Sequence, residues 1–95
     1  MKQIGINIWQ MDDGTVISGR EKDFLTYNEG SRFLKIPVEI IVKDIINKRV
    51  FGTAIYLNNK FKWSNNENVT DDEISTIKNN ISKIGNSLGY FIFKT

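Results

Sequence analysis

The sequence contains no cysteine and no histidine. Without cysteine there is no disulfide framework, no thiolate nucleophile and no cysteine-based zinc site. Without histidine the chain lacks the side chain that most often transfers protons near neutral pH, so no ordinary serine–histidine triad can form. The sequence also has no P-loop, no glycine-rich dinucleotide motif and no metal-ligand spacing. We therefore expect a protein that is not an enzyme and that uses neither a cofactor nor a metal.

Long apolar runs are also missing. No run approaches the roughly 18–20 residues that a helix needs to cross a bilayer. The N-terminal stretch MKQIGINIWQMDDG alternates apolar and polar residues and does not resemble the continuous apolar region of a signal peptide. These absences predict a cytoplasmic protein that has no membrane partner.

The chain has no large excess of one charge. Lysine and arginine number 13 against 11 aspartates and glutamates, and the formal net charge is +2. A nucleic-acid-binding domain usually carries a basic stripe or a much larger excess of cations. Charge alone therefore identifies no class of partner.

The residues that are present suit one small soluble domain. The chain has 95 residues, of which 40% are hydrophobic and 25% are charged. These fractions are ordinary for globular proteins, and the length lies near the lower end of common domain sizes. No internal repeat or linker divides the sequence, so we expect residues 1–95 to form a single domain.

Alternating apolar residues and short turn motifs predict that most of the chain forms β-strands. Ile4, Ile6 and Ile8 alternate with small or polar neighbours, which predicts one half-buried strand at the N-terminus. Asp13-Gly14 and the glycine-bearing stretch 28–31 predict hairpin turns. Further strands are expected at residues 15–18, 24–27, 32–42, 49–57 and 90–93.

Three features of the expected sheet leave alternatives open. Pro37 has no amide hydrogen, so its strand should lie at an edge, contain a bulge or break into two. Residues 43–48 form either one helical turn or a loop that closes onto the next strand. Glu39 interrupts an apolar strand and either points out of the sheet or pairs inside with Arg32 or Arg49, because a buried charge needs a partner.

One amphipathic helix is predicted at about residues 71–87. Thr70 and Glu73 have the spacing of a capping box, and acidic residues in the first turn complement the positive end of the helix dipole. The apolar stripe repeats at spacings of three and four and comprises Ile74, Ile77, Ile81, Ile84 and Leu88. The opposite, polar face comprises Thr76, Asn79, Asn80, Lys83 and Asn86.

These elements together predict an α+β fold. We expect a mostly antiparallel sheet of five to seven strands, with the helix at about 71–87 packed on one face. A short C-terminal strand follows the helix.

Residues 60–63, with the sequence KFKW, alternate lysines with aromatic residues. In an extended strand, Phe61 and Trp63 would face one way, and Lys60 and Lys62 the other. A preceding asparagine turn would then pair this segment with the strand before it, with the aromatic side chains in the core. Alternatively, exposed aromatic side chains beside lysines can stack nucleic-acid bases. A small nucleic-acid-binding domain that uses this segment is therefore the alternative function.

Several short features, taken in chain order, are similar to one bacterial family. They are Tyr27-x-Glu29-Gly30-x-Arg32, an aliphatic strand with Glu39, a strand leading to Trp63, and a helix with Ile77 and Asn80-Ile81. Through them, about residues 25 to 93 resemble the immunity protein 74 family, small proteins expected to neutralise a co-encoded toxin of a polymorphic or contact-dependent system. One departure is Ser64-Asn65-Asn66, where the family is expected to have a proline-containing acidic turn.

The resemblance implies a cytoplasmic immunity protein that binds a cognate toxin domain, often a nuclease, and covers its active or substrate site. Such recognition depends on complementary shape and charge and needs no catalytic group. The first expected toxin-binding group is the loop with Lys60, Lys62, Trp63, Asn65 and Glu67, in which Trp63 is the anchor if its side chain is exposed. The second group is Tyr27, Glu29 and Arg32, of which Glu29 and Arg32 can also pair across a hairpin.

Overall fold

The computed structural model describes the elements of an α+β fold, as predicted. It covers residues 1–19, 21, 23–46, 48–58, 60–84 and 90–94. The strands are β1 (Lys2–Gly5), β2 (Ile8–Gln10), β3 (Val16–Ser18), β4 (Phe24–Asn28), β5 (Phe33–Ile45), β6 (Lys48–Tyr56) and β7 (Tyr90–Lys94), and the helix is α1 (Asp71–Ser82).

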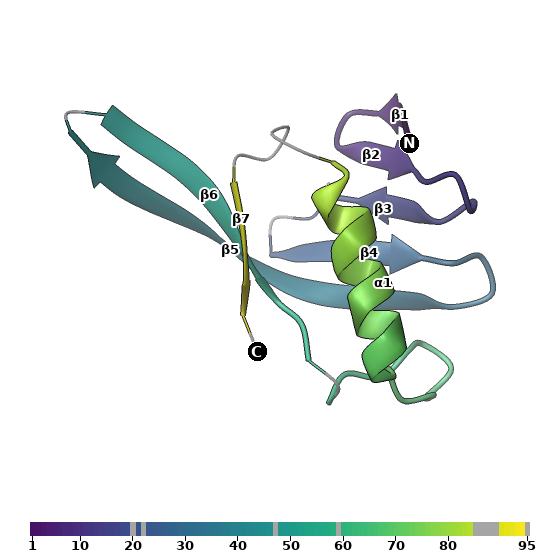
Figure 1. The fold of residues 1–95 in the computed structure, drawn as a ribbon. Coiled ribbons are helices and arrows are strands. Elements are labelled where there is room, and N and C mark those ends of the chain that lie inside the picture. Colours follow the sequence, from purple (N-terminus) through teal and green to yellow (C-terminus); the bar gives the residue numbers. More distant parts are fainter. Residues whose placement is uncertain (20, 22, 47, 59, 85–89, 95) are drawn as a thin grey trace.

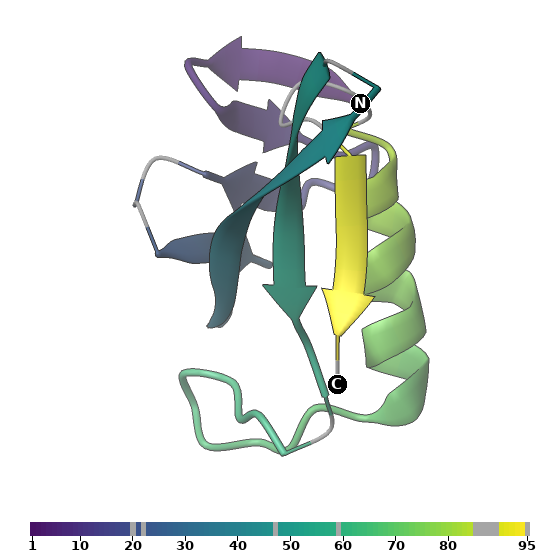
Figure 2. The ribbon, with the colours of Figure 1, turned by 90° about the vertical axis from the view of Figure 1, so that its left-hand side faces the viewer.

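The strands form one sheet in which the spatial order follows the order along the chain. Within the described residues this sheet has seven strands, and each neighbouring pair from β1 to β6 is antiparallel. The C-terminal strand β7 runs parallel to β6 (Figure 2). Helix α1 lies across one face of the sheet, and the β5–β6 hairpin projects from the body as a long arm (Figure 1).

The core lies between the sheet and α1. One row of directly opposed residues crosses four strands, and its members are Trp9, Ile17, Tyr27 and Leu34. Each of these side chains is at most 2% exposed. Because side chains alternate between the faces of a strand, this row and its apolar neighbours bury one face against Ile77 and Ile81 of the helix.

The N-terminal prediction of a single strand through Ile4, Ile6 and Ile8 is wrong. The chain turns at Ile6 and Asn7, so β1 and β2 form a hairpin. Asn7 has a φ of 55°, a conformation that asparagine tolerates better than most residues. The turn changes the alternation, so Trp9 is buried whereas Ile6 is 83% exposed.

The two predicted glycine turns are confirmed. Gly14 and Gly30 have φ values of 89° and 92°, in the region that favours glycine. In each turn a side-chain oxygen accepts a hydrogen bond from the backbone amide two residues later. Asp13 Oδ1 accepts a hydrogen bond from the Thr15 amide at 2.9 Å, and Asn28 Oδ1 accepts one from the Gly30 amide at 2.7 Å.

Pro37 lies where β5 changes partners and does not break the strand. The strand pairs with β4 as far as Pro37 and with β6 from Val38 onward. The amide of Val38 donates to the Asp23 carbonyl at 2.9 Å, on the β4 side. Successive residues of an antiparallel strand direct their backbone N–H groups to opposite edges. The backbone nitrogen of Pro37 therefore faces away from β4. Neither ladder requires an amide hydrogen there.

Within 43–48, residues 43–46 and 48 form the end of the projecting arm, and residue 47 lies outside the described residues. Ile45 pairs with Lys48, and Ile46 has a φ of 44° and is 90% exposed. The pairing of Ile45 with Lys48 decides for the alternative in which the chain closes onto the next strand. Glu39 is exposed on the arm and accepts a hydrogen bond from the Tyr56 hydroxyl at 2.8 Å, which decides for the outward-pointing alternative.

The predicted capping box of α1 is confirmed, but the helix ends earlier than predicted. Thr70 accepts from the Glu73 amide, and the Glu73 side chain accepts from the Thr70 amide. Lys83 is the C-cap, and its amide contacts the carbonyls of the last turn. Residues 85–89, which include both predicted terminal glycines, lie outside the described residues. No described helix is long and apolar enough to cross a membrane.

Candidate functional site

The 60–69 loop replaces the predicted Lys60–Trp63 strand, which is wrong. Only an isolated bridge joins Lys62 to Asn68. The Trp63 amide donates to the Glu67 carbonyl at 2.9 Å, so the loop satisfies part of its own backbone. Ser64 fastens the loop to the start of β5, because its amide donates to the Phe33 carbonyl at 2.9 Å and its hydroxyl accepts from the Phe33 amide at 3.0 Å.

The aromatic and basic side chains of this loop nevertheless face opposite environments. Trp63 is 2% exposed, and Phe61 packs against the core. Lys60 and Lys62 are exposed. The interpretation in which the aromatic residues belong to the core is therefore confirmed. Base stacking would require an exposed indole, and Trp63 is not available as an exposed anchor for any partner.

Arg32 connects the two groups of expected toxin-binding residues. Its guanidinium lies over the Trp63 ring, 3.9 Å from the ring centroid, in a cation–π arrangement. Its Nε contacts Glu29 Oε1 at 2.8 Å, and one Nη contacts Glu67 Oε2 at 3.7 Å. The other Nη bonds the Glu73 carboxylate. We call Arg32, Trp63 and these three glutamates the Arg32 cluster.

Two residues of the Arg32 cluster have perturbed ionisation. The hydrogen bond to Glu29 raises the pKa of Arg32, and Glu73 adds to this effect. The Thr70 amide is the largest cause of the lowered pKa of Glu73, with Arg32 adding to it. Glu73 therefore has two roles, since one oxygen caps the helix and the other holds Arg32.

Tyr27 forms the buried floor beneath this cluster. Its ring lies 6.1 Å from that of Trp63, between centroids, at an interplanar angle of 54°. Its hydroxyl accepts a hydrogen bond from Asn80 Nδ2 at 2.8 Å. Asn80 is only 5% exposed, so its predicted position on the polar helix face is wrong. Burial raises the pKa of the Tyr27 hydroxyl.

The buried position of Asn80 could have been predicted from its spacing, whereas the second contact of Glu73 could not. Asn80 follows Ile77 by three residues and precedes Ile84 by four, which places it on the apolar stripe. A polar residue at such a position needs a buried partner. The sequence predicts only a capping role for Glu73, because its second partner, Arg32, is 41 positions away.

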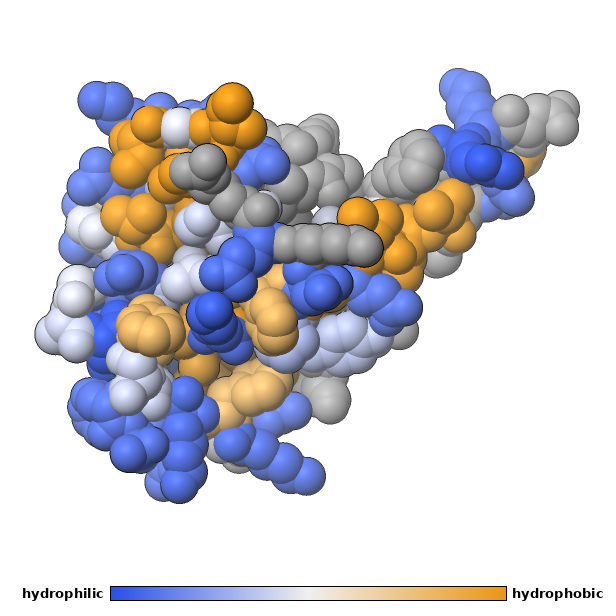
Figure 3. Space-filling model, turned by 180° about the vertical axis from the view of Figure 1, so that it is seen from behind, coloured by the Kyte–Doolittle hydropathy of each residue, from blue (hydrophilic) through white to orange (hydrophobic). Residues whose placement is uncertain are grey.

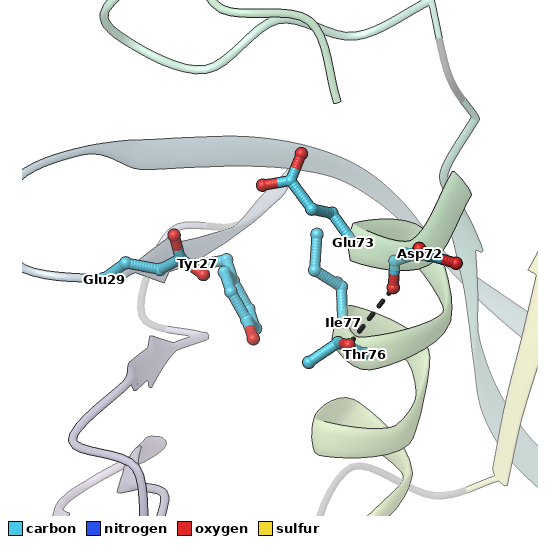
Figure 4. A pocket seen from close by; sticks show the side chains of 6 residues that line it. All are labelled: Tyr27, Glu29, Asp72, Glu73, Thr76 and Ile77. Carbon is cyan, nitrogen blue, oxygen red and sulfur yellow. Dashed lines mark hydrogen bonds between the residues drawn. The ribbon is translucent and has the colours of Figure 1, made fainter. Parts of the chain in front are cut away.

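Two hollows with acidic linings lie beside the Arg32 cluster. The first has a volume of about 230 Å³ and is lined by Tyr27, Glu29, Asp72, Glu73, Thr76 and Ile77. Figure 4 shows Tyr27 and Glu29 on one side of it and the helix residues on the other. The second hollow, of about 440 Å³, is lined by Asp13, Gly14, Thr15 and Glu29. Glu29 contributes to both, so the hollows adjoin.

The exposed rim of the Arg32 cluster comprises its own member Glu67 and the neighbouring Asn65. Asn65 and Glu67 are exposed and bond each other, with the Glu67 amide donating to Asn65 Oδ1 at 3.0 Å. The structure brings Glu67 to Arg32, whereas it shows no bond from the side chains of Lys60 or Lys62 to the described part of the cluster. In the described residues, no group of three or more acidic side chains has the arrangement of a metal site.

Replacing Glu73 by glutamine should reduce the acid sensitivity of the fold. The lowered pKa means that the unfolded chain binds this proton more readily than the folded chain. Glu73 therefore stabilises the fold above its ordinary pKa of 4.5, and this contribution is lost as the pH falls through the lower folded pKa. Glutamine retains a capping-box side chain but does not titrate.

The measurement is the urea unfolding midpoint from pH 7 down to pH 3 for both proteins. We expect the midpoint of Glu73→Gln to fall less steeply below pH 5 than that of the parent chain. Asp71→Asn, at an exposed position of the same helical turn, is the matched control and should keep the parent's slope. If the midpoints of Glu73→Gln and of the parent chain fell equally steeply with decreasing pH, Glu73 would not contribute to the acid sensitivity of the fold, and the prediction would be wrong.

No protein-family model, no curated protein and no solved structure matches the chain.

Proposed function

We propose that this protein is a cytoplasmic immunity protein that binds a cognate bacterial toxin domain and neutralises it by covering the toxin's active or substrate site. The supporting observation is the convergence of the resembling segments on Arg32. Arg32 itself belongs to the hairpin motif, Trp63 to the loop and Glu73 to the helix. Contacts between residues 41 positions apart in sequence join these segments into one surface.

The Arg32 cluster and its rim are the proposed contact surface. Arg32 holds three carboxylates in place before a partner arrives, so little side-chain entropy remains to be lost on binding. Trp63 supports Arg32 from beneath and makes no direct contact with the toxin. The exposed rim residues Asn65 and Glu67, with Asp72 nearby in the first hollow, would meet the partner.

Electrostatics at this surface favour a basic partner. The two hollows are lined by Asp13, Glu29, Asp72 and Glu73, and Arg32 compensates only part of their charge. A complementary basic patch on the toxin would increase the association rate and select the partner. This local excess of carboxylates is hidden in the formal net charge of +2 for the whole chain.

Co-expression with the toxin domain encoded immediately upstream tests the proposal. We expect relief of the growth arrest caused by the toxin, and co-purification of the two proteins. Glu67→Lys should weaken binding by roughly tenfold or more, because it places a cation at the rim of the contact surface. Glu21→Lys reverses an exposed charge beside Lys35 instead, and it should bind like the parent chain.

Several outcomes would overturn the proposal. An upstream gene that encodes no toxin, together with binding of oligonucleotides at moderate salt, would favour the nucleic-acid alternative. Rescue that is unchanged by Glu67→Lys but lost with Glu21→Lys would place the contact surface away from the Arg32 cluster. Failure of the pair to co-purify while growth is still arrested would reject the immunity function itself.

A further inference from the structure

The outer half of β5 has a sheet partner on one side only. Strand β4 pairs with β5 from Phe33 to Pro37, and beyond that point the described ladder continues only with β6. Among the described residues, no strand pairs with the second backbone edge of residues 39–45, which we call the open edge. An open edge is a template for pairing with another strand.

The open edge carries apolar side chains that belong to the core face of the strand. Leu34 and Ile36 are 2% and 0% exposed. Ile40 and Val42 lie farther along the same face of the strand and are 65% and 51% exposed. The core face of β5 thus extends past the part that the body covers. Figure 3 shows hydrophobic residues along the projecting arm. A two-stranded arm with uncovered apolar residues is marginally stable in water.

The backbone geometry identifies which residues offer hydrogen bonds at this edge. The Val38 amide donates toward β4, whereas the Phe33 amide and carbonyl bond Ser64 at the opposite edge. Alternate residues of an antiparallel strand point to alternate edges. The even-numbered residues Ile40 and Val42 therefore direct their backbone groups to the open edge. Any strand that pairs here must place opposite them residues whose own backbone N–H and C=O groups face this edge.

We propose that two copies of this chain pair through this edge, with β5 antiparallel to β5 about a two-fold axis at Ile41. In this register Ile40 of each copy opposes Val42 of the other. All four residues direct their backbone N–H and C=O groups to the shared edge. Glu39 of each copy opposes Lys43 of the other, so the pairing brings two opposite-charge pairs together. Antiparallel pairing of identical strands is self-complementary by symmetry.

Charge matching selects a second copy and this register. Only registers that place even-numbered residues of one copy opposite even-numbered residues of the other allow backbone hydrogen bonds between the two edges. A two-fold axis at Ile40 would oppose Glu39 to Ile41, and one at Val42 would oppose Lys43 to Ile41, so neither pairs the charges. Pairs of opposite charge that face each other across two strands stabilise an antiparallel ladder. The Arg32 cluster takes no part in this pairing, so the inference does not depend on the proposed function.

Sedimentation velocity on the full chain at several concentrations tests the pairing. We expect a concentration-dependent species of twice the 11.0 kDa chain mass. Glu39→Lys and Lys43→Glu should each raise the dimer dissociation constant by roughly tenfold, because each turns two attractive pairs into repulsive ones. The double variant Glu39→Lys/Lys43→Glu restores the opposition of charges and should dimerise like the parent chain.

Two controls separate this contact from other effects of the substitutions. Tyr56→Phe removes the hydrogen bond to Glu39 without changing a charge, and Lys48→Glu reverses an exposed charge on β6. Both should leave dimerisation unchanged. A chain that stays monomeric at every concentration would overturn the proposal. A dimer that is insensitive to both single reversals, or a double variant that fails to recover, would do the same.

Discussion

Replacing Ile81 by aspartate should unfold the protein. Ile81 is 0% exposed and belongs to the core cluster between α1 and the sheet. The substitution removes buried apolar surface and puts a carboxylate in its place, and the buried residues that the structure describes include no cation to pair with it. We expect a loss of at least about 4–5 kcal/mol in the free energy of unfolding, a large part of the total for a domain of this size.

Far-UV circular dichroism and urea unfolding would measure this loss. Asn79→Asp is the matched control, because it introduces a carboxylate at an exposed position of the same helix. Its unfolding midpoint should stay close to that of the parent chain. A folded, cooperatively unfolding Ile81→Asp variant would show that the helix does not pack on the sheet through this face.

Replacing Arg32 by alanine should have the second-largest effect. The side chain is 19% exposed and satisfies Glu29 and Glu73 while it covers the Trp63 ring. Its loss leaves two carboxylates close together without their shared cation and opens the indole to water. Charged hydrogen bonds and cation–π contacts of this kind predict a loss of about 2–3 kcal/mol after allowance for solvent screening.

Two measurements distinguish this role from general destabilisation. Urea unfolding gives the free energy, and acrylamide quenching reports whether one of the two buried tryptophans becomes accessible in the folded state. Arg32→Lys keeps the charge but cannot bond two carboxylates in the planar geometry of a guanidinium, so it should be intermediate. Unchanged quenching in Arg32→Ala would show that Trp63 is buried without the help of Arg32.

The two variants also test different parts of the proposed function. Ile81→Asp should abolish protection from the toxin because no folded surface remains. Arg32→Ala should leave a folded chain whose carboxylates are no longer held in place, so protection should fall even at temperatures where the variant is fully folded. The comparison therefore separates the organisation of the contact surface from the stability of the domain.

Several features of the fold followed from short stretches of sequence. Thr70 and Glu73 predicted the start of α1 because a capping box involves residues only three positions apart. Gly14 and Gly30 predicted their turns because few residues other than glycine adopt their positive φ values. The KFKW alternation predicted that the aromatic and lysine side chains face opposite ways, which holds although the described segment is a loop and forms no strand.

Other features could not be predicted in this way because their causes are not local. Asn7, with its positive φ, lies in a turn inside an apparently regular alternation, and this turn changes which side chains of the next strand face the core. The partner of Asn80 could not be predicted from local sequence, because Tyr27 lies 53 positions earlier in the chain. The helix ended at Ser82, although the apolar stripe continues in the sequence.

The sequence by itself determined the class of fold, the two glycine turns and the start of the helix, since these depend on interactions between residues close together in the chain. It also supplied both groups of expected toxin-binding residues, but as separate stretches. Only the tertiary structure decided that Arg32 joins them, that Trp63 is buried, and that the outer edge of β5 is open. These outcomes depend on which distant segments pack together. Because hydrophobic burial is non-directional, a local apolar pattern does not say which segment will cover it.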